Sequence, residues 1–419
     1  MRTNLDEPLS AQPPAGAPAS EPHISGTVLA VLILISTTTP IAMNMYLPAL
    51  PAIQQDFGTS TAVVQLSLSL FLVATAVGQL VAGPLSDIFG RRPVLTWGLS
   101  LFVIASIICT LAPSPAVLII GRMLQGFGGC TGMVLSRAIV RDIFGTATAA
   151  SMIGYVTMGI AVAPLLTPTL GGFIYEVSSW RFIFLFMCIT GVFSVLAMRL
   201  KLPESHPPVR QPDVFGRWRR EVGELLRIPT FWSLALTLAF LCVAFFTFVA
   251  GGTVVAVEVY ELGASEYGMF FVFMVSGYIV GNFVTGRYSR RIGLTRMIVM
   301  GNIIALVGVS LAVLLALTVP SHPFALFGPM LVVGMGNGLS LPNCVAGSVS
   351  VRPDLAGTAS GLSGAFQIGS GALASFAVGI MIDLDIWDDV RWPVLLLMLA
   401  GAVAAFITSL TIDARKLSA

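Results

Sequence analysis

The stretch GPLSDIFGRRPVL occupies Gly83–Leu95 and decides the fold, because it places an aspartate and two arginines between two long apolar runs. Neither Ala62–Ala82 before it nor the run from Pro93 to Pro113 contains a charged residue. At a rise of 1.5 Å per residue, about 20 residues cross the roughly 30 Å hydrocarbon core of a bilayer. The stretch therefore predicts a tight hairpin of two membrane-spanning helices, with its turn at a membrane surface.

Each residue type in this turn has a physical role. Gly83 and Gly90 allow a sharp turn and close backbone approach. Asp87 can lie at a helix N-terminus, where the helix dipole favours an anion. Arg91 and Arg92 are expected to hold the loop on the cytoplasmic side. The alternative interpretation is a generic basic loop.

The composition indicates a polytopic membrane protein. The chain has 419 residues, of which 56% are hydrophobic and 10% charged, with mean hydropathy +0.91, whereas soluble domains have roughly 25% charged residues. The net charge of +2 says nothing about partners, and no feature of the sequence suggests a nucleic-acid surface, so we expect no nucleic-acid partner. The five cysteines lie in apolar segments without a CxxC spacing, which is typical of small core residues rather than metal ligands.

Apolar runs of membrane-spanning length predict twelve helices. We place them at 27–47, 62–84, 93–112, 116–138, 147–172, 181–200, 230–256, 267–287, 296–318, 324–348, 358–383 and 392–412. With both termini in the cytoplasm, 19 of the 22 lysines and arginines fall on the cytoplasmic side, which fixes the topology. Arg181 and Arg391 remain outside, and Arg122 lies within a span.

The chain divides into two related halves. We expect a disordered cytoplasmic tail at 1–26, a six-helix bundle at 27–201, a cytoplasmic linker at 202–229, a second six-helix bundle at 230–412 and a short tail at 413–419. GQLVAGPLSDIFG from Gly78 aligns with GNFVTGRYSRRIG from Gly281, and SSWRFIF from Ser178 is similar to DVRWPVL from Asp389. Duplication of this kind is required by a transporter that rocks around a midplane site.

Arg122 is the leading candidate for a functional residue. It lies about two turns inside the fourth predicted span, in LIIGRMLQGFGG, where an unpaired cation costs several kcal/mol. Gln125 lies one helical turn away. The alternative is an interfacial arginine whose side chain reaches the outer headgroups.

The fifth predicted span contains several helix-bending residues in GIAVAPLLTPTLGG. These are Gly159, Pro164, Pro168, Gly171 and Gly172. Two prolines four residues apart bend a helix and release carbonyl groups, which must then face protein or a cavity.

Several of these motifs resemble those of the major facilitator superfamily of secondary transporters. The turn residues Gly83, Asp87, Gly90, Arg91 and Arg92 are similar to its loop between helices 2 and 3. The surroundings of Arg122 resemble its fourth-helix motif, in which the arginine lines the central cavity, and the fifth span resembles its antiporter motif, with Ala163 in place of a glycine. TTTPIAMNMYLPALP and RAIVRDIF from Arg137 are similar to the bicyclomycin and chloramphenicol resistance (Bcr/CflA) branch of twelve-span drug:proton antiporters.

The resemblance implies an all-α fold of two pseudo-symmetric six-helix bundles and export of small amphiphilic molecules driven by a proton gradient. Asp87 and Arg91, with Asp142 or the N-terminus of the eleventh helix, are expected to close the cytoplasmic side of the outward-open state. The branch usually has an aspartate where this chain has Asn44, and no predicted span has an acid at its middle. We therefore expect neutral or anionic substrates rather than cations.

We expect the substrate site to contain Arg122, Asn44, Gln125, Tyr46 and Phe245. A uniporter or importer of a sugar or organic acid is the alternative function. A membrane enzyme is disfavoured because the sequence has no HExxH, nucleophile elbow or phosphate-binding loop. We expect no cofactor and no metal, and a monomer surrounded by membrane lipid in the bacterial inner (plasma) membrane.

Overall fold

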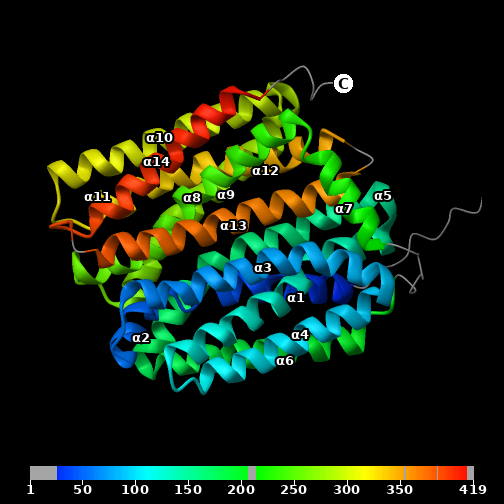
Figure 1. Cartoon of the computed structure of the whole chain (residues 1–419), viewed down its shortest axis with the longest axis horizontal. Helices are drawn as coiled ribbons and strands as arrows, with labels where there is room; N and C mark the ends of the chain where they lie inside the picture. The colour runs from blue at the N-terminus through cyan, green and yellow to red at the C-terminus, as the bar shows by residue number, and fades with distance from the viewer. Residues whose placement is uncertain (1–25, 206–213, 353–354, 385, 413–419) are drawn as a thin grey trace, which may run out of the picture.

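The computed structural model describes residues 26–205, 214–352, 355–384 and 386–412, without the side chains at 141, 144–155, 157–159, 161–162, 165, 214–215, 290 and 356. The first half of the chain forms α1 Gly26–Asn44, η1 Leu47–Ala49, α2 Leu50–Phe57, α3 Thr61–Phe89, α4 Arg91–Thr110, α5 Pro115–Val177 and α6 Trp180–Lys201. The second half forms α7 Val214–Leu225, α8 Pro229–Glu258, α9 Ala264–Ile292, α10 Leu294–Thr318, α11 Phe324–Phe327, α12 Met330–Ser350, α13 Ala356–Asp383 and α14 Arg391–Leu410. Apart from Gly26, which begins α1, the expected tails lie outside the described residues (Figure 1).

The predicted hairpin is present, and its turn is tighter than we expected. Helix α3 continues through Gly83 to Phe89, and α4 begins at Arg91, so Gly90 is the single residue between them. Gly90 has φ +92°, which a residue with a Cβ rarely adopts. Gly293 joins α9 to α10 with the same φ of +92°. The two halves therefore share this turn geometry as well as the sequence pattern around it.

Helix α5 contains two of the predicted spans. Its 63 residues would extend about 95 Å if straight, roughly three times the hydrocarbon thickness. Arg122 near its start bonds Ala42, while Gly171 near its end lies against Met45. The element must therefore fold back on itself. Among the described residues, eleven helices are long and apolar enough to cross a membrane, and the remaining predicted span, 147–172, lies in the second half of α5.

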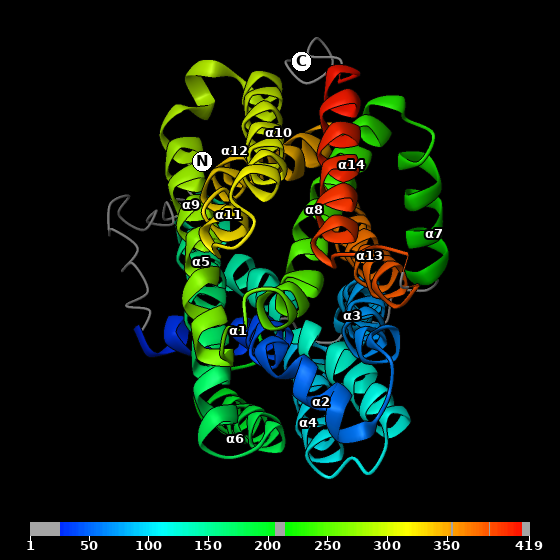
Figure 2. The same ribbon diagram turned by 90° about the vertical axis from the view of Figure 1, so that its left-hand side faces the viewer.

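The helices form two bundles that meet along two pairs of helices. Figure 2, which looks along the helices, shows α3 beside α13 and α5 beside α9. In the internal repeat, α3 corresponds to α9, and the second half of α5 corresponds to α13. Each bundle thus presents one helix of each kind to the other, as a pseudo-twofold axis requires. The predicted fold class is confirmed.

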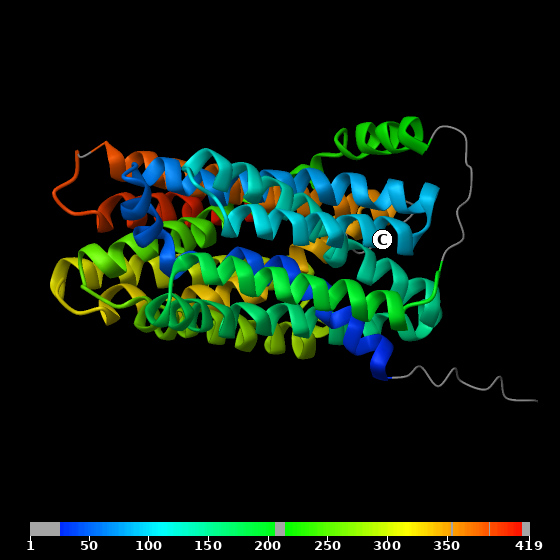
Figure 3. The same cartoon turned by 90° about the horizontal axis from the view of Figure 1, so that it is seen from below.

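The two ends of the molecule differ in charge. The turns at Gly90 and Gly293 lie at one end, which we call the arginine-rich end because Arg91, Arg92, Arg199, Arg287, Arg291 and Arg296 lie near it. The opposite end, the acid end, carries Asp56, Glu176, Glu258, Glu266, Asp383 and Asp389. Figure 3 shows α7, an amphipathic helix within the predicted linker 202–229, far from α2 at the acid end.

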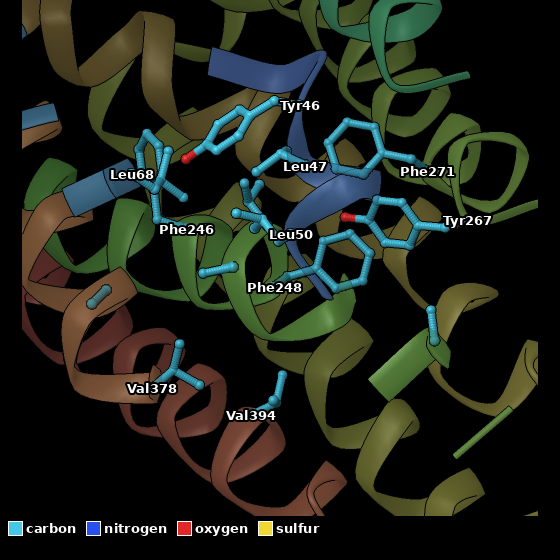
Figure 4. Close-up of a cluster of buried hydrophobic side chains, with 14 of the residues drawn as sticks. Tyr46, Leu47, Leu50, Leu68, Phe246, Phe248, Tyr267, Phe271, Val378 and Val394 are labelled. Atoms are coloured by element: carbon cyan, nitrogen blue, oxygen red, sulfur yellow. The ribbon is translucent and has the colours of Figure 1, made fainter. Parts of the chain in front are cut away.

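Apolar packing joins the bundles at the acid end. One buried cluster there combines Tyr46, Leu47 and Leu50 of the first half with Phe248 and Phe271 of the second (Figure 4). The Phe248 and Phe271 rings stack with centroids 6.0 Å apart. The buried clusters toward the arginine-rich end each draw their residues from one half of the chain only. Among the described residues, the apolar seal between bundles is therefore at the acid end.

Candidate functional site

Arg122 lies inside the first bundle and not against lipid. Arg122 is 0% exposed, and its guanidinium carbon lies 4.0 Å from the ring centroid of Tyr46 and 4.1 Å from that of Phe71. A guanidinium between two aromatic faces is stabilised by the negative faces of both rings. Phe71 could not be predicted as a neighbour of Arg122, because its position depends on how α3 is rotated about its axis.

The break in the first helix supplies a hydrogen-bond acceptor for this cation. Helix α1 ends at Asn44, so the carbonyl of Ala42 lies in its last turn, where helical carbonyls lack intrahelical partners. Arg122 NH1 donates to this carbonyl at 2.9 Å and to Gln125 Oε1 at 2.5 Å. Gln125 Nε2 in turn donates to Ser106 Oγ at 2.8 Å. This network holds the helix break against α4 and α5.

The cation keeps two donors without a partner. Arg122 Nε and NH2 are buried and make no hydrogen bond to any described residue. An unpaired buried donor is costly, and no carboxylate bonds this guanidinium within the described chain. When the surrounding helices separate, these two donors can bind an oxygen-bearing or anionic group of a small molecule.

Only part of the predicted substrate set comes together. Tyr46 joins Arg122 and Gln125, and its hydroxyl lies 3.3 Å from Ser67 Oγ. Asn44 donates to Pro40 O within its own helix at 2.8 Å, and its Oδ1 has no partner. Phe245 lies in α8 of the other bundle, edge-on to Phe246. Neither Asn44 nor Phe245 therefore makes a hydrogen bond or a cation–π contact with the arginine.

A second group of polar side chains lies between the bundles. Arg137 is exposed although it lies within the membrane-length segment Pro115–Val140, and it interacts electrostatically with Tyr278 of α9. Asn282 Nδ2 donates to Tyr278 O at 2.8 Å. Gln79 of α3 reaches Gly364 of α13, where its Oε1 lies 2.8 Å from the position that a Cβ would take. Arg137 lies at the end of the predicted span 116–138, and α5 continues past it.

Arg91 organises the arginine-rich end of the first bundle. Its NH1 donates to Asp87 Oδ1 at 2.6 Å and its Nε to Asp142 Oδ2 at 3.0 Å, and both groups belong to the first bundle. Asp87 lies in the last turn of α3, so our assignment of Asp87 to a helix N-terminus is wrong. Glu204 occupies that place, accepting from the backbone N–H of Arg91 at 2.9 Å and of Arg92 at 3.1 Å.

The fifth-span motif lies at the acid end. The helix continues through Pro164 and Pro168. The backbones of Gly171 and Gly172 approach Met45 and Ala264, respectively, so closely that a Cβ would lie 1.7 Å and 2.5 Å from their carbonyl oxygens. Gly159 falls outside the residues whose surroundings are described. The described glycines thus bring α5 against the helix break and against the other bundle.

Alanine substitutions should destabilise the protein at a closely packed glycine and not at one with free space around it. Gly171→Ala should lower the unfolding temperature of the purified protein and its yield, because overpacking costs about 1–3 kcal/mol. Gly83→Ala, whose Cβ would meet nothing within 4 Å, should be neutral or stabilise by up to about 1 kcal/mol, because α3 is helical there. Thermal unfolding in detergent compares the two variants, and equal destabilisation would contradict the packing described here.

Comparison with known proteins identifies the family. The family profile described as Major Facilitator Superfamily matches residues 32–375, so the chain belongs to this superfamily. It is 33% identical to an uncharacterized MFS-type transporter, YdgK, of Bacillus subtilis, over 84% of this chain and 88% of the relative. It is 27% identical to a bicyclomycin resistance protein homolog of Haemophilus influenzae (92% and 95% covered) and 29% identical to multidrug resistance protein D of Escherichia coli (84% and 88%).

Solved structures share the same fold. A D-xylose-proton symporter matches with a TM-score of 0.69 at 15% identity, covering 91% of this chain and 96% of the other. A bacterial homologue of the human lysosomal transporter Spinster, in an inward-facing and unoccupied conformation, matches with a TM-score of 0.68 at 18% identity, covering 92% and 94%. At these identities the likeness concerns the fold alone. The chain is a multi-pass membrane transporter of the drug-efflux branch predicted from its motifs.

Proposed function

We propose that this protein exports small amphiphilic molecules across the bacterial inner membrane by alternating access, as a monomeric carrier without catalytic activity. Similarity to proteins named for bicyclomycin and multidrug resistance over most of the chain carries this proposal. The distribution of lysine and arginine supports placing the arginine-rich end in the cytoplasm. With that orientation, the described state is closed to the outside.

The charges of the interior favour neutral or anionic substrates. Arg122 and Arg137 lie within the membrane-length segment Pro115–Val140, whereas each acidic residue in the eleven described spans lies in the first or last turn of its span. Within the described spans, a lipophilic cation would have no carboxylate to compensate for the loss of its hydration. A carbonyl, phenol or carboxylate of a substrate, in contrast, could accept a hydrogen bond from either guanidinium. The aromatic side chains of α8, including Phe245 and Phe246, provide apolar surface for the rest of the molecule.

Expression in a drug-sensitive bacterial host tests the direction of transport. An exporter should raise resistance to compounds such as bicyclomycin or chloramphenicol. Uptake into inverted membrane vesicles should then require an imposed pH gradient, because we also propose proton coupling. Unchanged resistance with restored growth on a sugar or organic acid would favour the importer instead.

Asn44→Asp tests the proposed substrate charge. A carboxylate at this position would lie one turn from Pro40 O, near the buried guanidinium. We expect the variant to gain transport of a cationic dye in inverted vesicles and to lose transport of a neutral substrate by about ten-fold, the effect of about 1.4 kcal/mol. Asn302→Asp, in the buried interface of α10 with α14, is the control for an added acid. Efficient cation transport by the native protein would contradict the proposal.

A further inference from the structure

The two bundles exchange helix caps at the acid end. Asp383, the last residue of α13, accepts from the backbone N–H of Thr61 at 3.1 Å and of Ala62 at 2.6 Å. These two residues begin α3 in the opposite bundle. The first N–H groups of a helix have no intrahelical partner and carry the positive end of the helix dipole, so a carboxylate there is favourable.

The pseudo-symmetric contact is also present. Glu176, next to the last residue of α5, accepts from the backbone N–H of Ser265 at 2.8 Å. Ser265 is the second residue of α9, again in the opposite bundle. Because α9 corresponds to α3 and the end of α5 corresponds to α13, the same interaction occurs twice, once at each seam between the bundles. We call these two contacts the crossed caps.

Packing around the crossed caps also joins the bundles. Gln65 of α3 donates to Ala250 O of α8 at 2.9 Å, and Ser375 of α13 lies 3.3 Å from Gln65 Oε1. At the other seam, Gly268 of α9 lies so close to Thr169 of α5 that a Cβ would come within 2.5 Å of its backbone. The caps therefore lie at the rim of a closed, well-packed face. Both carboxylates are exposed there.

We propose that Glu176 and Asp383 are positioning residues of the transport cycle, whose crossed caps hold the acid end closed and must both break before that end opens. The inference rests on the proposed function in one respect: it assumes that the two bundles move relative to each other during alternating access. Since the carboxylates bond backbone N–H groups, the contacts depend on the negative charge and not on the side chains of Thr61, Ala62 or Ser265.

Neighbouring acids make matched controls available. Glu266 Oε2 accepts from Gly263 N at 2.8 Å and so caps α9 from within its own bundle. It lies beside Glu176, since both carboxylates approach Gly263. Near Asp383 the other acid is Glu258 at the end of α8, which interacts with it electrostatically. Removing the charge of Glu266 weakens a cap of the same helix without breaking a contact between bundles.

Distances between spin labels test the proposal on the purified full-length protein without any substrate. Labels on cysteines introduced at Leu111 and Val319, the exposed residues that directly follow α4 and α10, report the acid end. Labels at Leu200 and Leu410 report the arginine-rich end. The five native cysteines are buried, which favours labelling of the introduced ones.

We expect the native protein to show mainly the short acid-end distance. Asp383→Asn and Glu176→Gln should each raise the ratio of open to closed acid ends by about five-fold, and the double variant by about 25-fold, as expected for two independent contacts at helix N-termini. Asp383→Glu, which keeps the charge, and Glu266→Gln should resemble the native protein. If Asp383→Asn does not fold, Glu176→Gln and its Glu266→Gln control decide the matter.

The outcomes separate the two proposals. Acid-end distances in Glu176→Gln that match those of Glu266→Gln would overturn the crossed caps. An acid end that opens in the cap variants, while the Leu200–Leu410 distance stays unchanged, would retain the caps but contradict rocking and thus the proposed function. The distances are measured without substrate and without a resistance assay, so an error in the proposed substrate class would not change either result.

Discussion

Arg122→Lys is expected to lower transport at subsaturating substrate by about 100-fold, although it keeps the positive charge. The planar guanidinium lies about 4 Å from two ring centroids and bonds Ala42 O and Gln125. An ammonium has no plane to place between two rings and cannot reproduce the fixed geometry of these bonds. Initial rates of efflux, normalised to the amount of protein in the membrane, provide the measurement.

Arg181→Lys is the matched control for this prediction. Arg181 also lies over an aromatic ring, 4.1 Å from the Trp180 centroid, and bonds Asp56 Oδ2 at 2.9 Å. Both members of that pair are partly exposed, and exposed pairs contribute roughly 0–1 kcal/mol. Its transport rate should change by less than about five-fold. If lysine at position 122 supports transport at the native rate, the aromatic sandwich has no functional role.

Arg91→Ala is expected to produce the largest loss of stability in the arginine-rich end. The Arg91 side chain is 6% exposed, and removing it leaves Asp142, which is 14% exposed, without its cation. Breaking such a pair costs about 3 kcal/mol, corresponding to a fall in unfolding temperature of roughly 3 °C for a chain of this length. Thermal unfolding of the purified protein in detergent measures this change.

Arg92→Ala and a double variant show whether pairing is the cause. Arg92 donates to Arg199 O in an exposed bond, so its removal should cost less than about 1 kcal/mol. Asp142→Ala should recover part of the loss in the Arg91→Ala background, because it removes the half-buried carboxylate that has lost its cation. Additive losses in the double variant would show that the two side chains act independently.

Patterns along the chain were sufficient to predict the membrane helices. Uncharged runs of spanning length predicted the bundle architecture, and the stretch around Gly90 predicted the hairpin. The alignment of Gly78 with Gly281 predicted the repeat, which reappears in the equal φ angles at Gly90 and Gly293. These features are local, or they recur with a fixed spacing, so a single sequence reveals them.

Contacts between distant segments could not be predicted in the same way. Asp383 and Thr61 are 322 residues apart, and no periodicity connects them. The neighbours of Arg122 depend on how each helix is rotated about its axis. In this structure the Phe71 ring lies at the guanidinium, whereas Asn44 bonds Pro40 O of its own helix. Asp87 was assigned to a helix N-terminus because a hydrophobic run does not show that α3 continues for another turn and a half.

The crossed caps also show what a fused duplicate can do that a symmetric dimer cannot. In a dimer of identical six-helix chains, one acidic codon would specify both seams, so every substitution there would alter two contacts together. In this chain, Glu176 and Asp383 are encoded separately and already differ in side-chain length and in the number of amides they bind. Selection can therefore adjust the strength of one seam while leaving the other untouched.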